Sequence, residues 1–105
     1  MAWIILLFAG LFEIIWAYSM KMSEGFTKLT PSVITLFFMI LSFALLATAM
    51  KSLPLGTAYT IWTGIGAIGS FVVGILILGE PASALRMFAA GLIVSGLILM
   101  KLSST

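Results

Sequence analysis

Long apolar stretches alternate with short polar breaks along this chain. Four stretches can be delimited, at about residues 2–20, 32–50, 58–78 and 85–101. A helix rises 1.5 Å per residue, so about 20 apolar residues are needed to cross the hydrocarbon core of a bilayer. The pattern therefore predicts an all-α membrane protein, with four transmembrane helices in a single domain over residues 1–105.

The breaks contain residues that end and restart helices. Residues 21–30 hold three charges and a glycine, and Pro31 can open the second helix at its first position. Residues 51–57 combine a lysine, a proline and a glycine, and residues 79–81 read Gly-Glu-Pro. A secretory signal peptide is rejected for the first stretch, because it lacks a positively charged start and carries Glu13.

Composition excludes several classes of function. Hydrophobic residues make up 63% of the chain and charged residues 8%, and Asp, His, Cys, Asn and Gln do not occur. Without His or Cys there is no Ser–His pair, cysteine nucleophile or metal cluster, so we expect no enzyme activity, metal or cofactor. The net charge of +2 is too small and too scattered for nucleic-acid binding.

The basic residues hardly favour one orientation of the chain in the membrane over the other. The side of the N-terminus, the 51–57 loop and the C-terminus carries two basic side chains, Lys51 and Lys101. The opposite side carries three, Lys21, Lys28 and Arg86. The N-terminal amine nearly cancels this difference, so the positive-inside rule leaves two alternatives open: a weak bias that selects one orientation, or insertion both ways.

Glu13 is the residue that most needs an explanation. It lies near the middle of the first stretch, and no Lys, Arg or His occurs at that depth anywhere in the chain. An acidic residue in the membrane is costly unless it faces protein or water, and burial disfavours its charged form. We therefore expect Glu13 to bind protons and cations in exchange. The alternative is a permanently protonated, structural glutamic acid.

Residues of the first stretch and of two other stretches can complete a site around Glu13. In the first stretch, Trp16 follows Glu13 by one turn and offers an aromatic wall with an N–H donor. The third stretch has Tyr59, Trp62, Thr63 and Gly66 at the spacing of one helix face. Tyr and Trp can equally form an interfacial belt. A serine in the second stretch, Ser42, is a candidate partner, although it can also bond back to its own helix.

Small residues mark positions of close packing or movement. Gly10 precedes Glu13 on the same face, where it lets another helix approach closely. Gly64 and Gly66 can form a hinge or simply allow tight packing. In the fourth stretch, small residues at the spacing that favours helix association indicate a dimer interface at Gly91, Ser95 and Gly96.

The chain resembles the small multidrug resistance transporters over essentially its whole length. The segment FEIIWA at 12–17 and the segment GTAYTIWTGIG at 56–66 carry this resemblance. Trp16, together with MKSLPLGT at 50–57, resembles the guanidinium-exporting branch of the family rather than the quaternary-ammonium branch.

The resemblance implies an antiparallel homodimer, inserted in both orientations in the bacterial cytoplasmic membrane. It implies that protons and guanidinium compete for the two Glu13 carboxylates, which gives proton-coupled export by alternating access. Trp16 and Ser42 would orient the glutamates, and Tyr59 and Trp62 would wall the pocket. Two rival functions stay open: a polyspecific exporter of quaternary ammonium and other hydrophobic cations, and a non-transporting membrane subunit that assembles with a partner.

Overall fold

A computed structural model describes residues 1–103, and this part of the chain forms four α-helices joined by short connections. They are α1 (Ala2–Met22), α2 (Leu29–Ala49), α3 (Leu55–Leu76) and α4 (Ala84–Leu102). Each of the four is long and apolar enough to cross a membrane. The expected all-α architecture with four membrane-length helices is confirmed.

Local chemistry explains where the helices begin and end. α2 starts at Leu29, so Pro31 occupies the third position of the helix instead of the expected first. A proline is tolerated there because the first N–H groups of a helix have no intrahelical partner. α3 follows Pro54, and Gly79, with a φ of 71°, turns the chain after α3. The Ser83 hydroxyl caps α4 by accepting a hydrogen bond from the backbone N–H of Arg86 at 3.3 Å.

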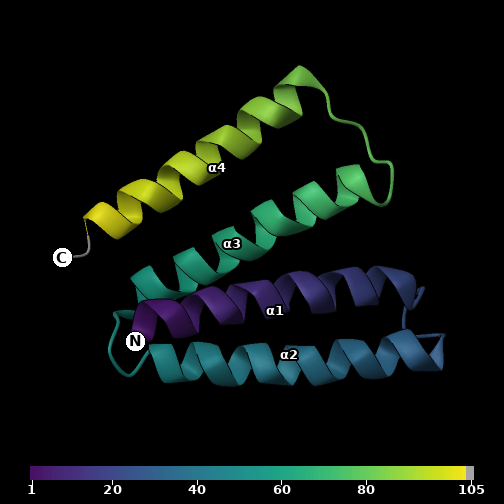
Figure 1. The fold of residues 1–105 in the computed structure, drawn as a ribbon, viewed down its shortest axis with the longest axis horizontal. Coiled ribbons are helices and arrows are strands. Elements are labelled where there is room, and N and C mark those ends of the chain that lie inside the picture. Colours follow the sequence, from purple (N-terminus) through teal and green to yellow (C-terminus); the bar gives the residue numbers. More distant parts are fainter. Residues whose placement is uncertain (104–105) are drawn as a thin grey trace.

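The helices lie side by side in the order α2, α1, α3, α4 (Figure 1). α1 packs against both α2 and α3, whereas the backbone of α4 approaches α3 alone. The N-terminus, the α2–α3 connection and the end of α4 lie at one end of the molecule, with the other two connections at the opposite end (Figure 1). This places the charged connections on the two sides that the sequence predicts.

The buried core lies among the first three helices. Its hydrophobic residues come from α1, α2 and α3: Leu6, Ala9, Leu46, Ala49, Ala58, Ile61 and Trp62. α4 contributes no buried residue. A chain that leaves one of its helices uncovered in this way relies on lipid or on a second protein surface for that helix.

Candidate functional site

Glu13 lies one residue past the midpoint of α1, the helix that α2 and α3 flank. Its side chain is half-buried, and its carboxylate lies against Gly66 of α3, where an added methyl group would overlap Oε1. Within residues 1–103, Oε1 is buried without a hydrogen-bond partner, and neither of the two ion pairs involves Glu13. The structure thus places an acid near the middle of a membrane-length helix, with no basic side chain of residues 1–103 paired to it.

Trp16 contributes a second polar atom without a partner. Its Nε1 is buried and donates no hydrogen bond to any of the described residues. The indole ring meets the Phe43 ring of α2 edge-on, with centroids 6.2 Å apart. Since buried polar atoms are usually paired, an unpaired donor and an unpaired acceptor one helical turn apart indicate a place for a ligand.

Ser42 links three helices through its hydroxyl group. The hydroxyl donates to the Ala9 carbonyl of α1 at 2.6 Å and accepts from the Trp62 indole N–H of α3 at 2.9 Å. Ser42 therefore bonds across the helix interface rather than back to its own helix. The Ala9 carbonyl is also the group to which an α-helix directs the Glu13 backbone N–H. The network thus holds the backbone that carries Glu13, while the Ser42 side chain does not bond to the carboxylate here.

A row of aromatic rings runs from α1 across α2 to α3. After the Trp16–Phe43 contact, centroids are 5.7 Å apart for Phe43 and Trp62 and 5.6 Å apart for Tyr59 and Trp62. Sequence reasoning missed Phe43, because a phenylalanine in an apolar stretch looks like a lipid-facing or packing residue. Its position next to Ser42 on α2 was the only available signal.

Tyr59 and Thr63 are exposed side chains of α3. Both line a cavity of about 480 Å³ between α3 and α4, and Glu13 is not part of that lining. The structure therefore brings Glu13, Gly66, Trp16, Ser42 and Trp62 into one region between α1, α2 and α3. A single chain does not close a pocket around the carboxylate with Tyr59 and Thr63.

The glycines of α1 and α3 are sites of close helix approach. A methyl group added at Gly10 would meet Ile65, and one at Gly64 would overlap Leu97 of α4. The hinge at Gly64 and Gly66 stays a prediction. On α4, a methyl group added at Gly91 or Gly96 would have no described atom within 4 Å apart from the nearby backbone of its own helix, and Ser95 bonds to the Gly91 carbonyl of its own helix at 2.8 Å. The α4 dimer interface likewise stays a prediction.

The arrangement suits reversible binding of a proton or a small cation. A half-buried carboxyl group at mid-depth can be neutralised either by a proton or by a cation. Aromatic faces from three helices can contribute cation–π attraction near it. Residues 1–103 contain no group of three acidic, His or Cys side chains that could hold a metal ion.

Comparisons with known proteins agree with these observations. The sequence model of the family described as Small Multidrug Resistance protein matches residues 1–93. A protein of Salmonella typhimurium strain LT2 is 59% identical over 104 residues, which are 99% of either chain. One from Citrobacter freundii is 57% identical over the same shares, and one from Yersinia pseudotuberculosis is 60% identical over 99% of this chain and 100% of its own. All three relatives are called guanidinium exporter.

Proposed function

The chain belongs to the small multidrug resistance family, and on that premise we propose that it exports guanidinium in exchange for protons. With four helices that are long and apolar enough to span a bilayer, it is a multi-pass membrane protein. Support for the substrate comes from relatives named guanidinium exporter that are 57–60% identical over 99% of this chain. The membrane in question is the bacterial cytoplasmic membrane, across which a proton gradient can drive export.

The observation that carries the proposal is the unpaired Glu13 carboxyl group. Its Oε1 is buried against Gly66 with no hydrogen-bond partner in residues 1–103. A structural glutamic acid would instead be expected to bond to a neighbouring helix, because unpaired buried polar groups are costly. A group that must alternate between proton and cation, in contrast, needs free acceptor oxygens.

Guanidinium matches this group in shape and charge. It is planar, stays protonated throughout the physiological pH range and offers N–H donors on every nitrogen. A carboxylate can accept two parallel hydrogen bonds from such an ion. Protons and guanidinium then compete for Glu13, so acidification removes the negative charge and weakens guanidinium binding. This competition couples inward proton movement to outward guanidinium movement.

A second copy of the chain, in the opposite orientation, completes the transporter. Alternating access in many transporters rests on two inverted halves that meet at a midplane site. Residues 1–103 form four helices, and the sequence shows no visible internal duplication, so two antiparallel chains would supply the two halves. In that arrangement Trp16, Ser42, Tyr59, Trp62 and Thr63 surround the paired Glu13 residues. Tyr59 and Thr63 are exposed in their own chain and are therefore available to the partner's glutamate.

The row of aromatic rings favours one rival function. Trp16, Phe43, Trp62 and Tyr59 could bind a quaternary ammonium ion, which has no N–H donors, through their faces. Guanidinium is preferred because the unpaired Glu13 oxygen can accept hydrogen bonds that such an ion cannot donate. Direct competition between the two cations decides between these functions.

The test uses the purified full-length chain in liposomes with an interior more acidic than the outside. Potassium and valinomycin hold the membrane potential at zero, so that the proton gradient is the driving force. Labelled guanidinium should accumulate inside as protons leave. Glu13→Gln should reduce uptake to the level of empty liposomes, because an amide neither releases a proton nor pairs with a cation. Glu24→Gln is the matched control, since that carboxylate lies on the surface in an ion pair with Lys28.

Three results would contradict the proposal. Uptake of tetramethylammonium but not of guanidinium would assign the chain to the quaternary-ammonium exporters. Uptake of neither cation by folded protein would favour a non-transporting assembly subunit. Full activity of Glu13→Gln would remove Glu13 from the mechanism.

A further inference from the structure

A second cavity, of about 310 Å³, lies where α1 ends and α3 approaches its connection to α4. Part of its lining is apolar and includes Ile14 and Phe71. The lining also includes four side chains with polar groups, namely Tyr18, Lys21, Ser70 and Glu80. The cavity therefore combines a carboxylate, an ammonium group, two aromatic rings and two hydroxyl groups near the charged end of the bundle.

The cavity begins about one helical turn from the proposed transport site. Ala17 lines it and lies four residues after Glu13 on α1, and Ser70 lines it and lies four residues after Gly66 on α3. Because residues four apart share a helix face, the cavity continues the same α1–α3 seam that holds the Glu13 carboxylate. A cation resting there would be next to Glu13 on its way across the membrane.

The Glu80 carboxylate lines this cavity and can accept further hydrogen bonds. Its backbone N–H donates to the Gly74 carbonyl at 2.9 Å, and its carboxylate packs against the bare Cα of Gly74. Within the described part of the chain, the carboxylate accepts no hydrogen bond and makes one ion pair, to Arg86 at 3.9 Å. Both side chains of this pair are 41% exposed, which makes it weak and readily exchanged.

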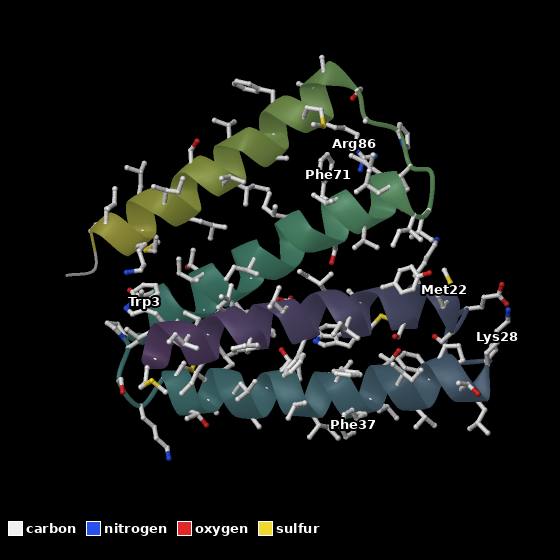
Figure 2. The ribbon with its side chains drawn as sticks, viewed as in Figure 1. Trp3, Met22, Lys28, Phe37, Phe71 and Arg86 are labelled. Carbon is white, nitrogen blue, oxygen red and sulfur yellow. The ribbon has the colours of Figure 1, made fainter. Side chains whose placement is uncertain are left out.

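The chain itself shows that this place suits a guanidinium group. The Arg86 guanidinium carbon lies 5.2 Å from the centroid of the Phe71 ring and pairs with Glu80. Figure 2 shows Arg86 and Phe71 next to one another between α3 and α4. Phe71 lines both the 310 Å³ cavity and a hollow of about 200 Å³ on the α4 side, where Arg86 lies. The carboxylate and the ring that hold Arg86 therefore also face the open cavity.

We propose that this cavity is a peripheral capture site for a guanidinium ion, held by the Glu80 carboxylate and the Phe71 ring. The incoming ion takes the Glu80 carboxylate from Arg86, whose side chain carries the same planar cation. Hydroxyl groups of Tyr18 and Ser70 line the way from Glu80 toward Glu13. The inference rests on the proposed substrate but adds a second binding site, outside the one that Glu13 forms.

Lys21 keeps binding at this site weak. Lys21 is exposed and also lines the cavity, so its ammonium group repels the guanidinium ion that binds there. A capture site on a transport path must release its ion as readily as it takes it up, so a weak site serves that purpose better than a tight one. Lys21→Ala is therefore expected to strengthen guanidinium binding.

The test follows Arg86 itself, the only arginine in the chain. Its side-chain Nε–H gives a single type of arginine signal in a ¹⁵N-correlation spectrum of the full-length protein in lipid nanodiscs. The Glu13→Gln variant is titrated with guanidinium chloride, and sodium chloride at equal ionic strength controls for screening. We expect a saturable shift of the Arg86 signal with guanidinium only. The shift should be lost in Glu13→Gln/Glu80→Gln and kept in Glu13→Gln/Glu24→Gln.

Transport by the chain with Glu13 intact provides a second measurement. Glu80→Gln should raise the KM for guanidinium about twofold to fivefold, as expected for one half-exposed charge, with kcat unchanged. Glu24→Gln should change neither constant. If Glu80→Gln lowers kcat and leaves KM unchanged, Glu80 has a structural role and the capture site is refuted.

The outcomes separate this site from the proposed function. Guanidinium transport without a Glu80-dependent shift would overturn the capture site and leave the transporter in place. A Glu80-dependent shift without transport by the wild-type chain would keep the site and refute export. A shift that survives Glu80→Gln, disappears in Lys21→Ala and follows the anion would overturn the site in favour of anion or lipid-headgroup binding.

Discussion

At the scale of single residues, the position of the Glu13 carboxylate depends on the absence of a side chain at Gly66. Gly66 has no side chain, and the carboxyl group occupies the space that a Cβ would need. Ser42 and Trp62 meanwhile hold the α1 backbone at Ala9, one turn before Glu13. The acid is therefore fixed through its backbone and left free at its oxygens. Such freedom is what proton and cation exchange requires.

Gly66→Ala is expected to impair transport severely. The new methyl group overlaps the Glu13 carboxylate, so either the side chain or α3 must shift, and overpacking of this kind costs about 1–3 kcal/mol. Guanidinium uptake into liposomes should fall about fivefold or more, since 1.4 kcal/mol corresponds to a factor of ten. Gly56→Ala on the same helix has no atom within 4 Å of the new methyl group and serves as control. Equal uptake by the two variants would show that the Gly66 contact has no functional importance.

Ser42→Ala is expected to destabilise the fold more than an equivalent change at the surface. The variant leaves the buried Trp62 N–H without its acceptor, at a cost of about 1–3 kcal/mol. The measurement is the free energy of unfolding in detergent micelles, with Thr48→Ala as the matched control. Thr48 also lies on α2 but is exposed and bonds to the Ala44 carbonyl of its own helix. A loss no greater than that of the control would mean that Ser42 does not connect the helices.

At the scale of helices, two kinds of contact hold the molecule together. α1 and α3 approach closely, with Ile65 above Gly10 and Ile14 above Gly69. α4 is attached more loosely: Leu97 fits against Gly64, and Lys101 lies 4.3 Å from the Trp3 ring centroid of α1. α4 is therefore the helix best placed to shift against the other three, while α1 and α3 keep the Glu13 region in register.

A double-mutant cycle at Gly64 and Leu97 tests this contact. Gly64→Ala should destabilise the protein because its methyl group overlaps Leu97, and Leu97→Ala should remove that overlap. We expect the double variant to be about 0.5–3 kcal/mol more stable than the sum of the two single effects. Unfolding free energies of all four proteins in the same detergent give the coupling. Additive effects would place the α3–α4 contact elsewhere.

At the scale of the whole molecule, one chain is a flat layer of helices. The extents along its principal axes are 43 × 35 × 16 Å, and α4 has no buried residue. Lipid can cover the apolar residues on the faces of this layer. It cannot form hydrogen bonds with polar groups such as the Thr63 side chain, which is exposed on α3. A second, antiparallel copy would cover these groups and the small residues Gly91, Ser95 and Gly96. The nearly balanced charges of the two ends are compatible with insertion in both orientations.

Dual insertion predicts half-labelling from either side of the membrane. The chain has no cysteine, so Ser52→Cys in the α2–α3 connection and Thr27→Cys in the α1–α2 connection each introduce a single thiol. A membrane-impermeant maleimide added to intact cells should label about half of each variant if the charge rule leaves the orientation undirected. Complete labelling of one variant and none of the other would establish a single orientation. Full labelling after permeabilisation controls for thiol reactivity.

Much of the architecture could be predicted from the sequence, because the membrane leaves few alternatives. Every backbone group in hydrocarbon must bond within the chain, so each apolar stretch of about 20 residues becomes a helix. Helix ends were less predictable: α2 begins at Leu29, before Pro31, since a proline is tolerated throughout the first turn. Glu13 stood out in the sequence for the same physical reason, as an acid where water is excluded.

The sequence by itself determined the number of helices, their sides and the chemically exceptional acid, because these follow from local composition and the cost of burying charge. Only the tertiary structure decided what touches that acid. In the structure, the Glu13 carboxylate lies against Gly66, and Ser42 bonds to Ala9 of α1 rather than within its own helix. Phe43 lies between two tryptophan rings. Glu80 and Phe71 both contact the Arg86 guanidinium. Each of these contacts joins residues from different helices or their connections. They depend on how the helices pack against one another, which no local pattern encodes.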